Sequence, residues 1–198
     1  MEKAKGWVFV AGVLILEALV LFYSINFGEN ENQMYLYASR YSARLSVVMM
    51  IVILAYTGRF GLKNIFRTRI RRGFLTNIVM ALVINHLIHF YFLATYREVS
   101  GIGLTIIDNK AGFVSYVLLV LSPLGMRWVK SLNWWLYGGL LTMLGFMSFV
   151  IIRTYLARVQ ALPEPYVFVI GLALMTITLV MNIYRLVREA PVPLSDRD

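Results

Sequence analysis

The only two histidines of the chain, His86 and His89, stand three residues apart in a long apolar stretch. Side chains at this spacing share one face of a helix, and Leu82 and Leu93 extend the same stripe. A neutral imidazole in a membrane helix can ligate haem iron or another metal, relay protons, or hydrogen-bond to a neighbouring helix. The residue types alone leave these three roles open.

A b-type haem would need a second axial ligand from another helix. Two side chains three residues apart on one helix cannot approach a single iron from opposite sides, and the chain has no third histidine. Methionine can serve as an axial ligand, and Met143 and Met147 lie in a later apolar stretch. In membrane helices, however, methionine more often fills space in the packing.

Two opposite charges fall within neighbouring apolar stretches, Glu17 in the first and Arg44 in the second. Ionisable residues inside a membrane are costly and are expected to find a partner. We therefore predict an intramembrane ion pair between Glu17 and Arg44. A proton or substrate site at these two residues is the alternative interpretation.

Other chemistries lack their residues. The chain has no cysteine, which excludes disulfides, thiolate-held iron–sulfur clusters and thiol catalysis. It also has no phosphate-binding loop, nucleophile triad or pair of carboxylates at catalytic spacing. We expect no catalytic residues, and if the chain does serve an enzyme, it does so as the electron-transfer subunit of an oxidoreductase.

The elements that position these residues are long apolar segments. The chain is 60% hydrophobic, whereas soluble domains are typically about 45–50% apolar. Its segments are continuously apolar and near the roughly 20 residues that a helix needs to cross a bilayer, which favours helices over barrel strands. We predict an all-α polytopic membrane protein, a six-helix bundle with helices at about 7–27, 41–57, 74–96, 112–128, 133–153 and 166–187.

Basic residues give the orientation of this bundle. Lys and Arg concentrate at the N-terminus, in the loop 58–73, in the turn after residue 126 and at the C-terminal end. Because such residues favour the cytoplasmic side, we predict both termini inside, with one membrane domain over 1–190 and a short tail over 191–198. The net charge of +9 thus reflects membrane orientation and not nucleic-acid binding. The basic loop suits anionic lipid or an acidic partner.

The order of these features resembles the ferric reductase-like transmembrane domain family. The segments that carry the likeness are "SRYSARLS" in the second helix, "RTRIRR" in the basic loop and "NHLIHFYFLATYRE" in the third helix, and the likeness covers about residues 38–188. Within that family it is closest in layout to the small haem-binding subunit that partners the bacterial periplasmic methionine sulfoxide reductase.

The resemblance implies b haem held between the third and fifth helices. His86 or His89 would supply the third-helix ligand. In the fifth helix Tyr137 and Val150 stand where the family has histidines, so the ligand set departs from the pattern, although tyrosine can ligate ferric haem. The resemblance therefore implies a diverged member that retains the architecture.

Three functions follow from these patterns. The first is a non-catalytic membrane subunit on a ferric reductase-like scaffold, working with other membrane subunits or as a homo-oligomer. The second is a haem b electron-transfer subunit that uses His86 or His89. The third is a small transporter or lipid-handling protein with a polar site near Glu17, Arg44 and the histidines. For all three we expect a multi-pass protein in contact with membrane lipid, in the bacterial inner membrane.

Overall fold

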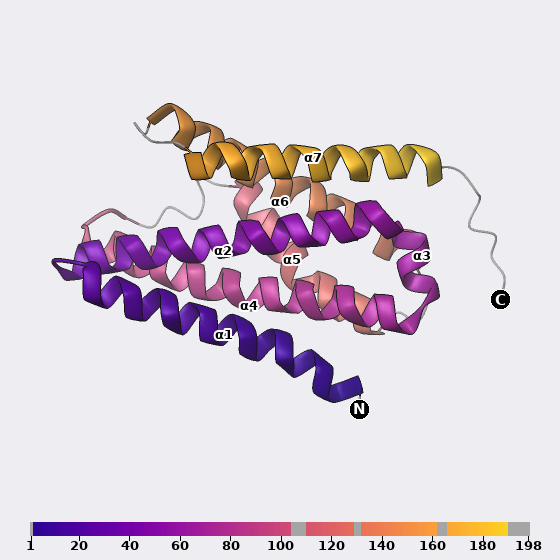
Figure 1. Cartoon of the computed structure of the whole chain (residues 1–198), viewed down its shortest axis with the longest axis horizontal. Helices are drawn as coiled ribbons and strands as arrows, with labels where there is room; N and C mark the ends of the chain where they lie inside the picture. Colours follow the sequence, from indigo (N-terminus) through magenta and orange to yellow (C-terminus); the bar gives the residue numbers. More distant parts are fainter. Residues whose placement is uncertain (1, 104–109, 129–131, 162–165, 190–198) are drawn as a thin grey trace.

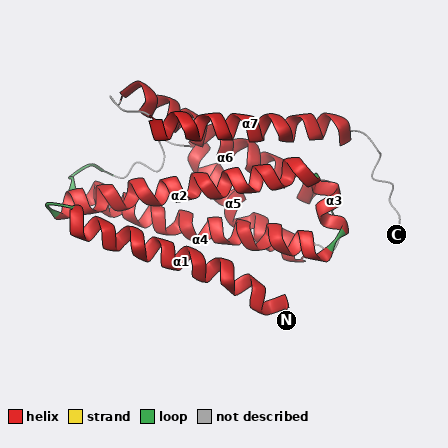
Figure 2. Ribbon diagram, in the orientation of Figure 1, coloured by secondary structure: helices red, strands yellow, loops and turns green. Residues whose placement is uncertain are grey.

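The computed structural model describes residues 2–103, 110–128, 132–161 and 166–189, and within these ranges the chain is almost entirely helical (Figure 2). Short connections join the helices, and no strand occurs in the described ranges. The helices are α1 Glu2–Phe27, α2 Glu31–Phe60, α3 Leu62–Arg67, α4 Arg69–Val99, α5 Lys110–Trp128, α6 Trp134–Ala161 and α7 Tyr166–Glu189. The predicted all-α class is confirmed.

Five of the described helices are long and apolar enough to cross a membrane. They contain the spans Trp7–Phe27, Glu31–Phe60, Arg69–Val99, Trp134–Gln160 and Tyr166–Arg188. These are the helices of a multi-pass membrane protein. The remaining long helix, α5, is the shortest of the six, and at about 1.5 Å per residue its 19 residues cover roughly 28 Å.

The boundaries of α2 differ most from the prediction, because the helix begins about ten residues earlier than expected. The Asn30 side chain caps its first turn by accepting a hydrogen bond from the Gln33 N–H, a favourable use of asparagine at this position. The prediction placed residues 31–40 outside this helix because many of them are polar. Ser39 is instead a buried helix residue. The short helix α3 inside the basic loop was not predicted.

Helix α2 occupies the centre of the bundle (Figure 1). It lies between α4 and α7, while α1 packs against both α2 and α4. Helices α5 and α6 form an antiparallel pair behind them, with α5 against α4 and α6 against α7. Helix α1 begins and α7 ends toward the end of the bundle that holds α3. Both termini of the helical domain thus lie at one end, whichever side of the membrane that end faces.

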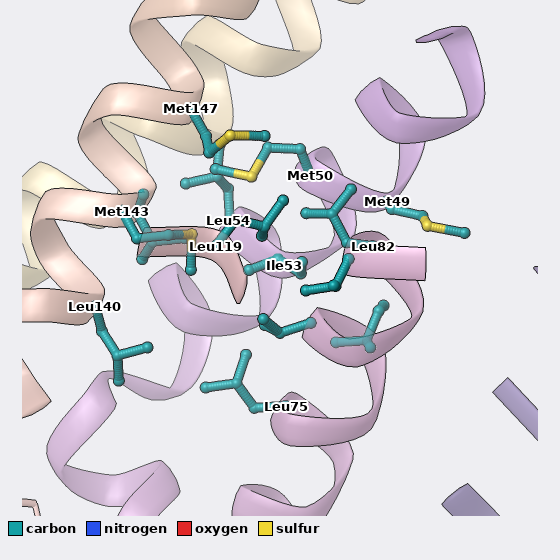
Figure 3. Close-up of a cluster of buried hydrophobic side chains, with 14 of the residues drawn as sticks. Met49, Met50, Ile53, Leu54, Leu75, Leu82, Leu119, Leu140, Met143 and Met147 are labelled. Carbon is teal, nitrogen blue, oxygen red and sulfur yellow. The ribbon is translucent and has the colours of Figure 1, made fainter. Parts of the chain in front are cut away.

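The apolar core sits between α2, α4, α5 and α6 (Figure 3). Its centre contains Met50, Ile53, Leu82, Leu119 and Met143, each at most 1% exposed. Several methionines meet here, which suits irregular gaps because the unbranched side chain adapts its shape. Methionines of α6 are therefore packing residues in this bundle.

Close helix contact fixes α7 on α2. A Cβ added at Gly58 would lie 3.1 Å from the Met181 Cβ and 3.3 Å from the Asn182 backbone nitrogen. Beside this contact the Thr57 hydroxyl donates to the Asn182 side-chain oxygen over 2.7 Å, and the Asn182 amide donates to the Leu54 carbonyl. Small residues and interhelical hydrogen bonds are the usual means of packing helices in lipid.

Candidate functional site

A buried carboxyl group stands at the middle of the first apolar span. Glu17 is the central residue of Trp7–Phe27, so at about 1.5 Å per residue it lies roughly 15 Å from either end. Its side chain is 4% exposed and points into the bundle. The carboxyl oxygen Oε1 accepts a hydrogen bond from the Ser42 hydroxyl over 2.7 Å. An ionisable group therefore lies at the middle of this apolar span.

The tight turn at Gly28 explains why Ser42 returns to the level of Glu17. A Cβ at Gly28 would lie 2.8 Å from the Met34 backbone and from the Ser24 carbonyl, so only glycine fits between the two helices there. Because α1 and α2 then run antiparallel from this turn, residues at similar distances from it face each other. Glu17 and Ser42 are such a pair.

Asn85 of α4 joins this pair from a third helix. Its side chain is fully buried, and its amide donates to Glu17 Oε1 and lies 3.4 Å from the Ser42 carbonyl oxygen. The Asn85 side-chain oxygen accepts a hydrogen bond from the Ser46 hydroxyl. One amide therefore connects α1, α2 and α4 through hydrogen bonds.

The two histidines continue the polar network along α4. His86 Nδ1 lies 2.9 Å from the Ser46 hydroxyl oxygen, and the His86 ring contacts the rings of Tyr116 and His89 at centroid distances of 5.0 and 5.9 Å. His89 interacts with the Ser39 backbone. We call Glu17, Ser42, Ser46, Asn85, His86 and His89 the polar cluster.

Two polar atoms of the polar cluster have no hydrogen-bond partner among the described residues. They are Glu17 Oε2 and His89 Nδ1, both buried. A buried polar atom without a partner is costly, and native structures keep few of them. Glu17 Oε2 lies at one end of the hydrogen-bonded chain that runs from Glu17 to His86, and His89 Nδ1 lies beyond its other end, where the two histidine rings are in contact. They are the positions where the cluster can accept a proton or a small polar ligand.

Arg44 does not join Glu17, and the predicted ion pair is absent from the described part of the bundle. The Arg44 guanidinium instead lies 4.8 Å from the Tyr41 ring centroid and 5.7 Å from that of Phe168 on α7. Two residues along a helix correspond to a rotation of about 200°. Since Ser42 faces Glu17, Arg44 projects from the opposite side of α2.

The aromatic contacts offset only part of the cost of this arginine. A cation over an aromatic ring gains about 0.5–2 kcal/mol. Insertion of an arginine at the centre of a membrane helix costs about 2.5–3.5 kcal/mol on the scale that gives the lowest values. Arg44 is partly exposed, and no ion pair to a carboxylate accompanies it among the described residues.

The residues named for haem do not come together. Tyr137 lies in the first turn of α6, at the α3 end of the bundle, while α5 packs between α4 and α6. His86 Nδ1 is already engaged by Ser46, and His89 shares its helix. The described residues also hold no group of three His, Cys, Asp or Glu side chains suited to a metal ion. This arrangement does not fit a haem with two axial ligands.

The serines of the polar cluster were not recognised from the sequence. Ser39, Ser42 and Ser46 recur at helical spacing along one face of α2, and that periodicity was the available signal. The predicted start of this helix at residue 41 left Ser39 outside it, so that only Ser42 and Ser46 fell within the predicted span. Glu17, Asn85 and both histidines were recognised because each is polar within an apolar run.

No family model, no curated protein and no solved structure matches this chain.

Proposed function

We propose that the chain is a small proton-linked membrane carrier, with the polar cluster as its working site. In this proposal six helices cross the bacterial inner membrane, α5 being the shortest, and both termini face the cytoplasm. The basic segment after α2 gives this orientation, because Lys and Arg favour the cytoplasmic side.

The observation that carries the proposal is the half-satisfied carboxyl group of Glu17. One oxygen is held by Ser42 and Asn85, whereas Oε2 has no partner among the described residues. An ionisable residue deep in a membrane domain is a functional site by default. In carriers, substrate and coupling-ion sites lie near the bilayer midplane, which is the depth of Glu17 in α1.

The geometry suggests how protons would be handled. Glu17 takes up a proton on Oε2, while Ser42 and Asn85 keep the carboxyl group oriented through Oε1. Ser46 and His86 lie on the far side of Asn85, and His89 stands one turn further along α4. The histidines accept and donate protons through their ring nitrogens, and His89, whose ring contacts that of His86, has an Nδ1 without a partner among the described residues.

Proton flux into liposomes tests this proposal. Purified protein is reconstituted with a pH-sensitive dye inside, and an inward pH gradient drives proton entry. We expect flux above that of empty liposomes, and Glu17→Gln should return it to that background because the amide cannot exchange a proton in the same way. Glu31→Gln is the matched control, since Glu31 is an exposed carboxyl group at the start of α2.

Two results would contradict the proposal. The first is proton flux into liposomes with wild-type protein that is no higher than the flux into empty liposomes. Equal flux from Glu17→Gln and wild type would show that protons do not pass through this carboxyl group. Both readings require that each variant elute as a folded, monodisperse species, which gel filtration verifies.

One observation favours a second candidate, the non-catalytic membrane subunit. Helix α5 has 19 residues and covers about 28 Å, slightly less than the roughly 30 Å of a hydrocarbon core. Short spans can be accommodated by oligomerisation, and Phe113, Val117 and Leu121 of α5 expose apolar side chains. Native mass spectrometry of the protein extracted from its own membranes tests this candidate, and a mass of one chain alone would refute it.

A further inference from the structure

Arg44 is a cation near the membrane midplane whose surroundings differ from those of Glu17. It stands two residues beyond Ser42, which contacts Glu17, and so shares the depth of that carboxyl group. The guanidinium projects toward Phe168 of α7 and lies over the Tyr41 ring. The Glu17 carboxyl group and the Arg44 guanidinium therefore lie on opposite sides of α2.

Two aromatic rings lie beside the guanidinium, Tyr41 of its own helix and Phe168 of α7. Tyr155 of α6 lies next to the second of these rings. Tyr155 is 6% exposed, and its ring packs against Phe168 with a centroid distance of 5.0 Å. Gly171 makes room for that ring, because an added Cβ would lie 2.5 Å from Tyr155 Cε1. Packing thus holds Tyr155 next to Phe168, the α7 ring that the Arg44 guanidinium approaches.

These groups have the chemistry of an anion site. A guanidinium offers a planar fork of N–H donors that matches the oxygens of a phosphate group. Phenol hydroxyls add donors without adding charge. No carboxylate forms an ion pair with Arg44 in the described ranges, where the guanidinium lies beside two aromatic rings, and this leaves it able to bind an anion from outside these ranges.

We propose that Arg44, with Tyr41 and Tyr155, binds a phosphate group between α2, α6 and α7. The proposal rests on the carrier function above, because it names the substrate class of that carrier. An anion bound at Arg44 and a proton bound at Glu17 bring no net charge into the bundle. Such pairing lowers the electrostatic cost of moving an anion through lipid. The phosphate belongs either to a free ion or to the headgroup of an anionic lipid.

Equilibrium binding to the full-length protein in nanodiscs tests the proposal. In the first arm, radiolabelled inorganic phosphate is titrated in zwitterionic lipid. In the second arm, native mass spectrometry counts phosphatidylglycerol molecules retained by the protein. We expect one of the two to bind, with Arg44→Gln weakening the affinity at least tenfold. Arg44→Lys keeps the charge without the fork, so it should weaken binding less, and it serves if Arg44→Gln does not fold.

Arg153→Gln is the matched control, because Arg153 is an exposed arginine on α6 two residues before Tyr155. The affinity of this variant for the bound ligand should equal that of wild type. Saturable binding of inorganic phosphate that depends on Arg44 supports a soluble substrate, and retention of phosphatidylglycerol alone supports a lipid headgroup. Absence of both, or binding that both Arg44 variants leave unchanged, overturns the proposal.

The two proposals fail separately. Phosphate binding is measured without a proton gradient, so Glu17→Gln should retain it while losing proton flux. Loss of flux in that variant together with Arg44-independent binding would leave the carrier function standing and remove the anion site. Binding that depends on Arg44, together with no proton flux in wild type, would leave the anion site standing and remove the carrier function.

Discussion

Replacing Asn85 with leucine removes the one side chain that ties α1, α2 and α4 together. Its amide donates to Glu17 and its oxygen accepts from Ser46, and both bonds cross between helices. Interhelical hydrogen bonds in a membrane average about 0.6 kcal/mol and reach about 1.7 kcal/mol. Loss of two such bonds predicts that the free energy of unfolding falls by about 1–3 kcal/mol, since leucine has a similar size but no polar atom.

The matched control is Asn26→Leu, which makes the same chemical change in α1. The Asn26 amide donates only to the Phe22 carbonyl of its own helix, over 2.7 Å, and the residue is exposed. We expect this variant to unfold within about 0.5 kcal/mol of wild type, as surface changes usually do. Reversible unfolding in mixed micelles, followed by far-UV circular dichroism against the mole fraction of sodium dodecyl sulfate, measures both values.

Equal stability of Asn85→Leu and wild type would refute this reasoning, because the polar cluster would then contribute nothing to the packing of the three helices. A loss as large in Asn26→Leu would refute it too, since the cost would belong to leucine in general. The double variant Glu17→Gln with Asn85→Leu adds a further check. Residues in one network are not additive, so its loss should be smaller than the sum of the two single losses.

Two further predictions concern the helix packing and the orientation. Gly58→Val should lower the free energy of unfolding by about 1–3 kcal/mol through overpacking, because a Cβ there meets the backbone of α7. Gly12→Val, with open space around its Cβ position, should have little effect in the same micelle assay, and similar losses would contradict the packing argument. A reporter enzyme that is active only in the cytoplasm should be active when it is fused to either terminus, since the basic segment after α2 favours that side. An inactive fusion at either terminus would contradict the proposed orientation.

The helical elements follow from the sequence because lipid leaves the backbone no other partner. Each predicted segment corresponds to a helix, from α1 to α7, with α3 as the unpredicted addition. The ends of the helices follow less directly from the sequence, as the start of α2 illustrates. Its first ten residues contain polar side chains that hydropathy reads as loop, whereas in the bundle Ser39 is buried against neighbouring helices.

The polar residues of the site were only partly predictable. Glu17, Asn85 and His86 are conspicuous because each interrupts an apolar run. The opposite charges of Glu17 and Arg44 predicted an ion pair between them. The rotation of α2 gives Glu17 the hydroxyl of Ser42 instead and turns Arg44 toward Phe168. Charge alone carries no information about which face of a helix a residue occupies relative to its neighbours.

The amino-acid sequence by itself determined that this chain forms long apolar helices and that a few polar groups are buried among them. Both results depend on local composition, because a backbone in lipid must satisfy its own hydrogen bonds. Only the tertiary structure decided that Asn85 bridges Glu17 and Ser46, that α5 lies between Tyr137 of α6 and the histidines of α4, and that Arg44 lies beside two aromatic rings. These outcomes depend on helix rotation and neighbour order, which are set by packing between segments distant in the chain.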